Sequence, residues 1–193
     1  MITSFQDLGL EYKTKLNQVL EDADWAPIEK FAHSLLKTWQ EGRQLFICGN
    51  GGSAGNAIHI ANDFIYGISK KYGSALKVHA LTANSSVMTC LANDEGYDKI
   101  FSYPLAVQAN EGDVLLVLSG SGNSANILNV LRAAKEIGVE SYAILGFSGG
   151  EAKAVVDTPI HFEINDMQIS EDLQLIVCHM VMQWLYANRE QVQ

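Results

Sequence analysis

His59 and Asp63 are the residues whose types and spacing best suit chemistry, because they are four positions apart in a segment with helical spacing of its apolar residues. On a helix, two residues four apart share one face. An imidazole beside a carboxylate can bind a divalent metal or transfer protons. A glycine-rich turn at 49–53 directly precedes this segment, and free backbone amides at the start of a helix bind anions. The sequence therefore predicts an anion site followed by a reactive helix face.

The turn is preceded by an apolar run, Leu45–Cys48, which is typical of a buried parallel strand. Gly49, Gly51 and Gly52 allow the backbone to turn tightly and to approach a ligand closely. Ser53 belongs to the residue types that cap helices, so we predict that it is the N-cap of the helix that follows. The strand, the turn and the start of the helix would together hold the anion.

A second polar segment, Ser119–Ser124, also follows an apolar run and directly precedes a predicted helix over 125–137. Its serine hydroxyls and the amide of Asn123 can bind phosphate without a cationic side chain. Ligands of open α/β sheets bind at the carboxyl ends of the strands, where the strand order reverses. We therefore expect the two polar segments to form one phosphate site.

Two nucleotide-binding motifs fit these segments less well. Residues 49–54 match the loose G-x-G-x-x-A pattern of dinucleotide-binding folds, but the second predicted strand offers no acidic residue for a ribose at its end, 79–84. A mononucleotide P-loop requires a Gly-Lys pair, which neither segment contains. A small phosphorylated ligand is the better prediction.

The remaining chain predicts an α/β fold that would position these segments. Four further strands are expected at 76–82, 113–118, 141–145 and 158–162, separated by helices or loops, which indicates βαβ crossovers and a mostly parallel sheet. Residues 1–193 are expected to form a single domain. Its first part, 1–42, contains two amphipathic helices that are either a covering layer or an oligomerisation segment. The second part, 43–193, is the α/β core and ends in a long helix that is apolar nearly all round, which suggests a partner subunit.

Composition and charge exclude several classes of partner. The chain has 48% hydrophobic and 18% charged residues and a net charge of −9, which argues against broad contact with nucleic acid or an anionic membrane. Residues 1–12 lack the features of a signal peptide, and no apolar run is long enough to span a membrane. Three cysteines in apolar surroundings, Cys48, Cys90 and Cys178, are expected to be reduced core residues of a cytoplasmic protein.

Five motifs together resemble the sugar isomerase (SIS) domain family. They are GNGGS at 49–53, AND-x-G at 92–96, GDVLL at 112–116, S-x-SGNS at 119–124 and a histidine late in the last helix, His179. Within this family the chain is most similar to the phosphoheptose isomerase group. The resemblance implies a three-layer α/β sandwich with a five-stranded parallel sheet in flavodoxin-like order. It also implies a homotetramer with active sites between subunits, and an aldose–ketose isomerase that converts sedoheptulose 7-phosphate to a manno-heptose 7-phosphate.

The same resemblance implies which residues bind the substrate and a zinc ion. The expected substrate-binding residues are Asn50, Gly51, Gly52, Ser53, Asp94, Ser119, Gly120, Ser121, Asn123 and Ser124. The expected zinc ligands are His59, Asp63, Glu171 and His179, of which Asp63 and His179 would also transfer protons. The family has Glu where this chain has Asp63 and Gln where it has Glu171. Two imidazoles with two carboxylates suit zinc, and also allow manganese or iron(II).

The position of the fourth ligand remains open between two neighbouring acids. Glu171 precedes His179 by eight residues, which is about 80° around the helix, whereas Asp172 precedes it by seven, about 20°. The resemblance favours Glu171 and the angle favours Asp172.

The alternative function is a non-catalytic SIS module that binds a phosphosugar or a protein partner, and a third possibility is an isomerase for a different sugar phosphate.

Overall fold

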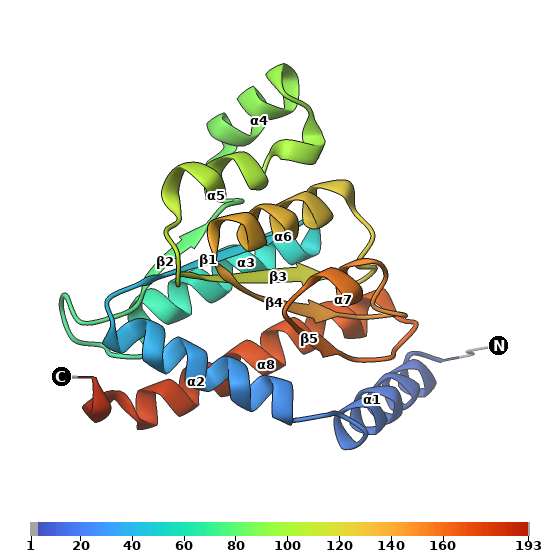
Figure 1. Cartoon of the computed structure of the whole chain (residues 1–193). Helices are drawn as coiled ribbons and strands as arrows, with labels where there is room; N and C mark the ends of the chain where they lie inside the picture. Colours follow the sequence, from blue (N-terminus) through green and yellow to red (C-terminus); the bar gives the residue numbers. More distant parts are fainter. Residues whose placement is uncertain (1–3, 193) are drawn as a thin grey trace.

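Five parallel strands form the centre of the fold, in the order β2-β1-β3-β4-β5 (Figure 1). The structure is a computed structural model and describes residues 4–192. The strands are β1 Gln44–Gly49, β2 Lys77–Ala80, β3 Val114–Ser119, β4 Glu140–Leu145 and β5 Thr158–His161. All six residues of β3 are buried, as expected for a central strand covered on both faces. The predicted five-stranded parallel sheet and its flavodoxin-like order are confirmed.

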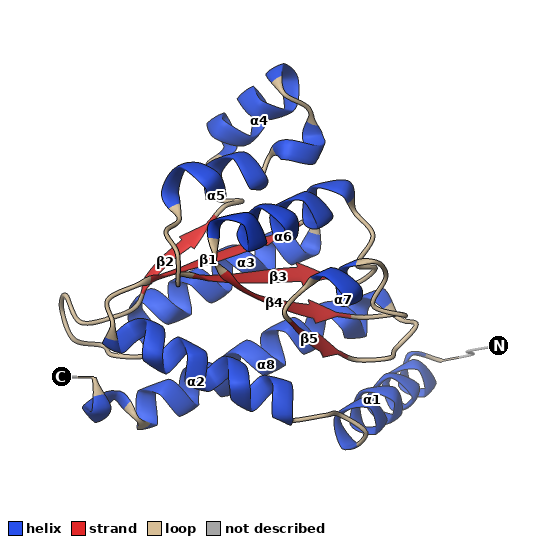
Figure 2. Cartoon of the chain, in the orientation of Figure 1, coloured by secondary structure: helices blue, strands red, loops and turns tan. Residues whose placement is uncertain are grey.

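Helices cover both faces of this sheet, which gives three layers (Figure 2). The helices are α1 Phe5–Glu21, α2 Ala26–Gln40, α3 Gly52–Asn62, α4 Ser85–Asp94, α5 Ser102–Gln108, α6 Ala125–Ile137, α7 Ala152–Val155 and α8 Met167–Ala187. One apolar core joins the sheet to α2, α3 and α8, and a second joins its other face to α5, α6 and α7. Short helical turns at Tyr97–Lys99 and Arg189–Gln191 follow α4 and α8.

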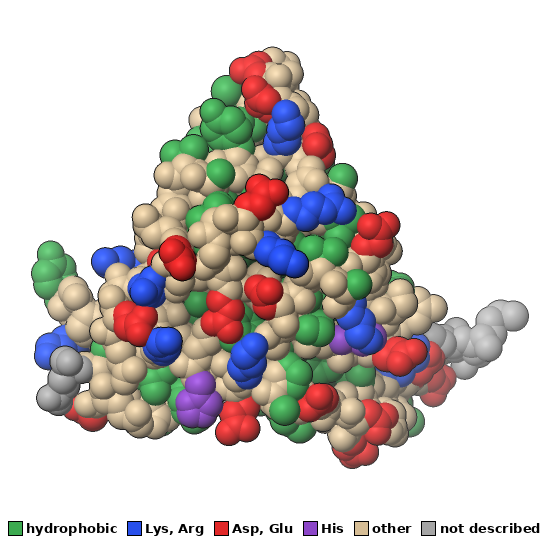
Figure 3. Space-filling model, viewed as in Figure 1, with side chains coloured by type: hydrophobic (Ala, Val, Ile, Leu, Met, Phe, Trp, Pro, Cys, Tyr) green, Lys and Arg blue, Asp and Glu red, His purple; other side chains and the backbone are tan. Residues whose placement is uncertain are grey.

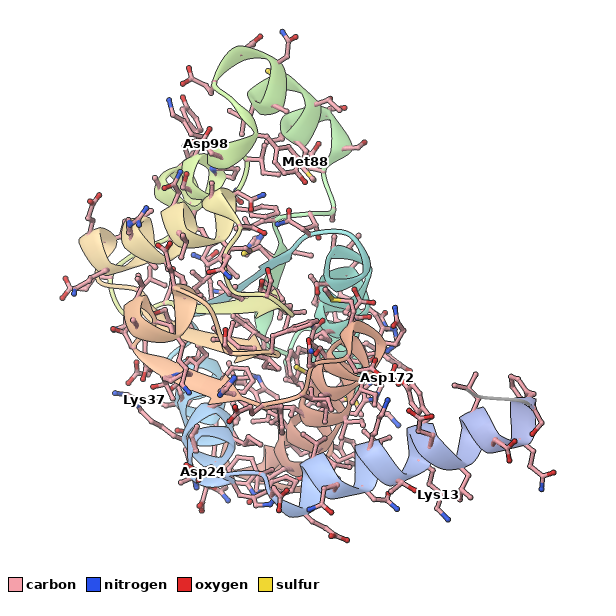
Figure 4. The ribbon with its side chains drawn as sticks, turned by 90° about the vertical axis from the view of Figure 1, so that its right-hand side faces the viewer. Lys13, Asp24, Lys37, Met88, Asp98 and Asp172 are labelled. Carbon is pink, nitrogen blue, oxygen red and sulfur yellow. The ribbon has the colours of Figure 1, made fainter. Side chains whose placement is uncertain are left out.

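Helix α1 extends from the body of the molecule beside the first half of α8 (Figures 1 and 4). Only Val19 of this helix is buried, and the side chain of Phe5 is 88% exposed. The Tyr12 hydroxyl of α1 donates a hydrogen bond to Asp172 of α8, and Lys15 Nζ lies 3.8 Å from Asp166 Oδ2. An apolar helix end that its own chain does not cover is a surface on which another molecule could pack.

The cysteine prediction is correct for two residues and wrong for the third. Cys48 and Cys178 are buried, and burial raises the pKa of both thiols. Cys90 is exposed on α4, and its thiol donates a hydrogen bond to Asp94 Oδ2 at 3.4 Å. The error arises because α4 projects from the sheet, so that only Leu91 of this helix is buried (Figure 1).

Charged side chains are spread over the visible surface of the molecule. The face shown in Figure 3 carries acidic and basic side chains interspersed with apolar ones. Within the described part of the chain, no helix combines the length and apolarity needed to cross a membrane.

Candidate active site

The two polar segments lie side by side at the point where the strand order reverses. The chain passes from β1 to β2 on one side and then to β3 on the other, so the loops after β1 and β3 flank the switch point. Gly49 at the end of β1 is in register with Leu118 near the end of β3. Each loop leads directly into a helix, α3 or α6. The fold therefore places the two polar segments next to each other, as predicted.

Gly49 is required by the close packing between these loops. A Cβ atom at this position would lie 2.8 Å from the carbonyl oxygen of Leu118 and 2.8 Å from the Cβ of Ser53. Such contacts are too short for any side chain, so glycine lets the end of β1, the end of β3 and the first turn of α3 meet.

Ser53 is not the N-cap of α3, in contrast to the prediction. The N-cap is Gly51, whose φ of 58° suits a glycine, and no side chain caps this helix end. Ser53 instead lies within the first turn and is 4% exposed. Its hydroxyl oxygen accepts a hydrogen bond of 3.0 Å from Gln174 Nε2 on α8. No serine side chain therefore accepts a hydrogen bond from the backbone amides at this end of α3, and these amides are available to bind an anion.

The loop after β3 presents its hydroxyls in a similar way. Ser119 Oγ accepts a hydrogen bond of 3.0 Å from the backbone N–H of Gly122. Ser121 Oγ lies 3.5 Å from the backbone N–H of Asn123. Ser124 is the N-cap residue of α6 but makes no side-chain cap hydrogen bond. Because an accepting hydroxyl keeps its own proton, both Ser119 and Ser121 can still donate to a bound oxyanion.

An amide pair links the two loops directly. Asn50 Nδ2 donates to Asn126 Oδ1, and Asn126 Nδ2 donates back to Asn50 Oδ1, both at 2.9 Å. The Tyr97 hydroxyl donates a further hydrogen bond to Asn50 Oδ1 at 3.1 Å. Both polar ends of the Asn50 side chain are therefore engaged within the chain. These hydrogen bonds hold the two loops together, and because the Asn50 amide has a second N–H, its contact with the sugar stays a prediction.

Substitution of Gly122 should damage the second loop. This glycine has a φ of +67°, and a Cβ on it would lie 2.1 Å from the carbonyl oxygen of Gly149. We expect Gly122→Ala to lower the free energy of unfolding by at least about 1–2 kcal/mol, measured by urea denaturation, because of the left-handed backbone and the backbone collision. The matched control is Gly55→Ala on α3, where a Cβ would meet open space. It should be neutral or stabilise by up to about 1 kcal/mol, and equal losses in both variants would contradict the prediction.

A second cluster, the His59–Asp63–His179 triangle, lies along the face that α3 presents to α8. His59 Nε2 lies 3.1 Å from His179 Nε2, and Asp63 Oδ2 lies 3.6 Å from His59 Nε2 and 3.2 Å from His179 Nε2. The Asp63 side chain is mostly buried, whereas the two imidazoles are about half exposed. The helix face predicted from the spacing of His59 and Asp63 thus meets the predicted late histidine.

A local change of helix type coincides with this triangle. Helix α3 ends at Asn62 and continues directly as a π-helical turn, Asp63–Gly67. Such turns widen the backbone and are frequent at functional sites. Here the turn begins at Asp63, the residue that contributes the carboxylate.

The geometry of the triangle fits a tetrahedral metal ion. Zinc binds nitrogen and oxygen ligands at about 2.0–2.1 Å, which places neighbouring ligand atoms of a tetrahedron about 3.3 Å apart. The three observed separations, 3.1, 3.2 and 3.6 Å, lie close to this value. Two imidazoles and one carboxylate also form the three-ligand set that catalytic zinc sites use, with one position left for water or substrate. The residues present therefore suit the predicted metal.

The predicted fourth ligand does not lie with the other three. Among the described residues, the group whose ligand atoms lie within 4.8 Å of one another is His59, Asp63 and His179, without Glu171. The Glu171 carboxylate instead lies against Gly52, where an added Cβ would be 2.3 and 2.4 Å from its oxygens. The physical reason is that eight residues advance about 12 Å along a helix, so Glu171 and His179 are far apart on α8.

The alternative fourth ligand, Asp172, is also engaged elsewhere. It accepts a hydrogen bond from Tyr12 of α1 and lies on the part of α8 that α1 approaches (Figure 4). Burial, with the hydrogen bond and negative charge of Asp172, raises the pKa of Tyr12 to about 12. Asp172 thus attaches α1 to α8 and is not part of the triangle.

Asp94 is the predicted substrate-binding residue with the least support from this chain alone. It is the last residue of α4 and is exposed. Its carboxylate oxygens accept from the Cys90 thiol and from Asn93 Nδ2, both on α4. Within residues 4–192, these contacts connect Asp94 to its own helix and not to either loop.

Three residues of the site were missed by sequence reasoning: Asn126, Gln174 and Tyr97. Asn126 and Gln174 are each 1% exposed, and their amides contact Asn50 and Ser53. Polar residues at core positions of otherwise apolar helices are the signal that could have found the first two, because buried amides require partners. The position of Tyr97 in a short turn carries no such signal.

Comparison with known proteins places this chain in one family. A sequence model described as the SIS domain matches residues 11–146, and the chain belongs to the SIS domain family. The phosphoheptose isomerase of Clostridium acetobutylicum is 35% identical to it over 176 residues, which is 90% of this chain and 87% of that protein. The phosphoheptose isomerase of Aliarcobacter butzleri is 31% identical over 174 residues, with 90% and 91% covered.

A solved structure supports the same grouping. The phosphoheptose isomerase GmhA from Neisseria gonorrhoeae superposes with a TM-score of 0.86 over 95% of this chain and 100% of that chain, at 26% sequence identity. The predicted membership of the SIS family, its likeness to the phosphoheptose isomerases and the predicted class of isomerase are confirmed by these comparisons.

Proposed function

We propose that this chain is an aldose–ketose isomerase that interconverts sedoheptulose 7-phosphate and a manno-heptose 7-phosphate. The observation that carries the proposal is the arrangement along α3. Its first turn adjoins the serine loops, and the His59–Asp63–His179 triangle follows seven residues after Gly52, about 10 Å along the axis. A phosphate held at one end would place the other end of an extended sugar at the triangle.

Binding of the phosphate is assigned to the loop residues. Ser53, Ser119, Ser121 and Ser124 would donate hydroxyl hydrogen bonds, and the backbone amides of Gly51 and Gly52 would add to them. Asn50, Gly120, Asn123 and Asp94 complete the proposed substrate-binding set. Anchoring at the phosphate uses binding energy far from the reacting carbons to position C1 and C2.

Proton transfer is assigned to Asp63 and His179. In the aldose-to-ketose direction, one of them takes the proton from C2 while the aldehyde oxygen gains a proton, which gives the enediol. A proton is then added at C1 while the C2 hydroxyl loses its own, so that no proton is gained or lost overall. Side chains suited to this step are effective when their pKa is near neutrality. A divalent ion bound by His59, Asp63 and His179, with zinc the best match, would supply Lewis-acid polarisation of the sugar carbonyl.

The test combines metal analysis with turnover. The purified protein should contain a divalent ion and should convert sedoheptulose 7-phosphate to the aldose, with activity lost on chelation and restored by zinc. Metal-free protein that binds sugar phosphates without turnover would instead support a non-catalytic SIS module. Turnover of a different sugar phosphate alone would retain the reaction class and revise the substrate.

We also propose that the chain forms a homotetramer in the cytoplasm, with α1 in the subunit contacts. The support is that Phe5 and Leu8 share a face of α1 and are 88% and 42% exposed. The double variant Phe5→Ser/Leu8→Ser should form a smaller species in size-exclusion chromatography with light scattering, while its circular dichroism stays unchanged. Lys13→Ser on the same helix is the control (Figure 4), and an unchanged mass of the double variant would contradict the role of α1.

A further inference from the structure

Helices α3 and α8 lie side by side (Figures 1 and 4), and two side-chain amides, one half-buried and one buried, connect them between the loop and the triangle. Gln174 of α8 is 1% exposed. Its Nε2 donates to Ser53 Oγ at 3.0 Å, and its Oε1 accepts from Asn56 Nδ2 at 3.0 Å. Asn56 Nδ2 also donates to the backbone carbonyl of Glu171 at 3.0 Å. Four groups thus form one continuous chain of hydrogen bonds that ends at a serine of the proposed phosphate site.

The direction of this chain is fixed by its first member. A backbone carbonyl oxygen can only accept, so the amide nitrogen of Asn56 must face Glu171 O. That same nitrogen then faces Gln174, which must present its oxygen. The nitrogen of Gln174 is left for Ser53. Since a reversed amide would set two donors against each other, only this orientation satisfies every buried group.

The consequence concerns the hydroxyl proton of Ser53. Its oxygen already accepts from Gln174, so the proton points to another acceptor. Within residues 4–192, Ser53 Oγ accepts from Gln174 and donates no hydrogen bond to another group of the protein. The hydroxyl lies in the first turn of α3, beside amides that are themselves donors. A phosphate oxygen is the group that such a set of donors would bind.

We propose that Gln174, oriented by Asn56, is a positioning residue that holds the Ser53 hydroxyl as a donor for the substrate phosphate. The proposal rests on the proposed phosphate site but not on the isomerase reaction. It predicts that a change at Asn56, whose side chain makes no hydrogen bond to Ser53, weakens phosphate binding by reversing the Gln174 amide.

The test is a double-mutant cycle with inorganic phosphate as the probe, measured by isothermal titration calorimetry. In Asn56→Asp, the new carboxylate accepts from Gln174 Nε2, so Gln174 Oε1 turns to Ser53 and takes its hydroxyl proton. We expect Asn56→Asp to raise the phosphate Kd about 10- to 100-fold, the loss of one hydrogen bond to a charged group. Ser53→Ala should raise it similarly, and Asn56→Asp should add little in the Ser53→Ala background.

The cycle separates an effect carried by the hydrogen bonds from Asn56 through Gln174 to Ser53 from simple repulsion between the added carboxylate and phosphate. If repulsion is the cause, Asn56→Asp weakens phosphate binding by the same factor with and without Ser53, and the proposal is overturned. An unchanged phosphate Kd in Asn56→Asp, or no phosphate binding by the wild-type protein, would overturn it as well. If the wild-type protein binds phosphate but does not turn over sugar phosphates, the proposed isomerase function is wrong, and the cycle still tests whether Gln174 positions Ser53.

A neutral variant on α8 provides the matched comparison. Gln174→Met removes the donor without adding charge, and should raise the phosphate Kd several-fold because the hydroxyl is no longer held. Gln183→Met makes the same change at an exposed position of α8 and should leave the Kd unchanged. In an active enzyme, Gln174→Met should raise KM with little change in kcat at saturation. A lower kcat at unchanged KM would contradict a role in phosphate binding.

Discussion

Replacing Asp63 with Asn should lower kcat by at least about 10²- to 10⁴-fold, the contribution typical of a general acid–base residue. The Asp63 carboxylate lies 3.2 Å from His179 Nε2 and is mostly buried on the face between α3 and α8. Asn keeps the size of the side chain but can neither take a proton nor bind a metal as an anion. The measurement is steady-state turnover of sedoheptulose 7-phosphate, with binding of the sugar phosphate followed by calorimetry.

Binding should survive because the serine loops that we propose as the phosphate site do not include Asp63. His179→Ala should show the same pattern, a large loss of kcat with sugar phosphate still bound. Asp172→Asn is the control on α8, since its carboxylate contacts Tyr12 and not the triangle, and it should retain activity. Full activity of either Asp63→Asn or His179→Ala would reject the proton-transfer assignment.

Local patterns predicted the elements of the fold well. Strand β1, residues 44–49, was predicted from one short apolar run, and helix α6, Ala125–Ile137, from the helical spacing of its apolar residues. The two polar loops follow such runs, so the strand order was enough to bring them together at the switch point. These predictions succeeded because each depends on neighbours in the chain or on the general rules of parallel sheets.

The positions of several side chains could not be predicted from the sequence because they depend on contacts between distant residues. Ser53 has the type of an N-cap, but its hydroxyl is used by Gln174, which is 121 residues away in the sequence. Glu171 occupies a ligand position in the resemblance, but its carboxylate lies against Gly52. The periodicity of the local sequence predicts neither contact, because both contacts depend on how α8 packs against α3. The exposed Cys90 fails for a related reason, since its helix projects from the sheet.

The pairing of α3 with α8 also explains why the site has two separable parts. At its amino end, the pair joins Ser53 to Gln174 beside the serine loops. Further along, it joins His59 and Asp63 to His179. Variants at the first part should act on phosphate affinity, and variants at the second on metal content and kcat. This separation lets binding and chemistry be tested independently.

Metal binding should depend on three residues of this pair and not on a fourth. Removing one ligand from the triangle with His59→Ala should weaken zinc affinity by more than the 10- to 100-fold that loss of an outer-shell partner costs. Glu171→Ala, which removes any ligand at this position, should leave zinc affinity close to that of the wild-type protein, because the Glu171 carboxylate lies at Gly52. Metal per chain is measured by mass spectrometry after dialysis, and affinity by competition with a chromogenic chelator.

The comparison between these two variants decides the composition of the metal site. His59 and Glu171 lie on the same helix pair, so a general loss of packing between α3 and α8 would affect both and would also lower the melting temperature of the metal-free protein. Zinc lost from His59→Ala but kept by Glu171→Ala, at equal melting temperatures, supports three protein ligands with an open position. If Glu171→Ala loses zinc as completely as His59→Ala, the carboxylate is a fourth ligand and the three-ligand site is wrong. If both variants keep zinc, the metal binds elsewhere and the triangle acts in proton transfer alone.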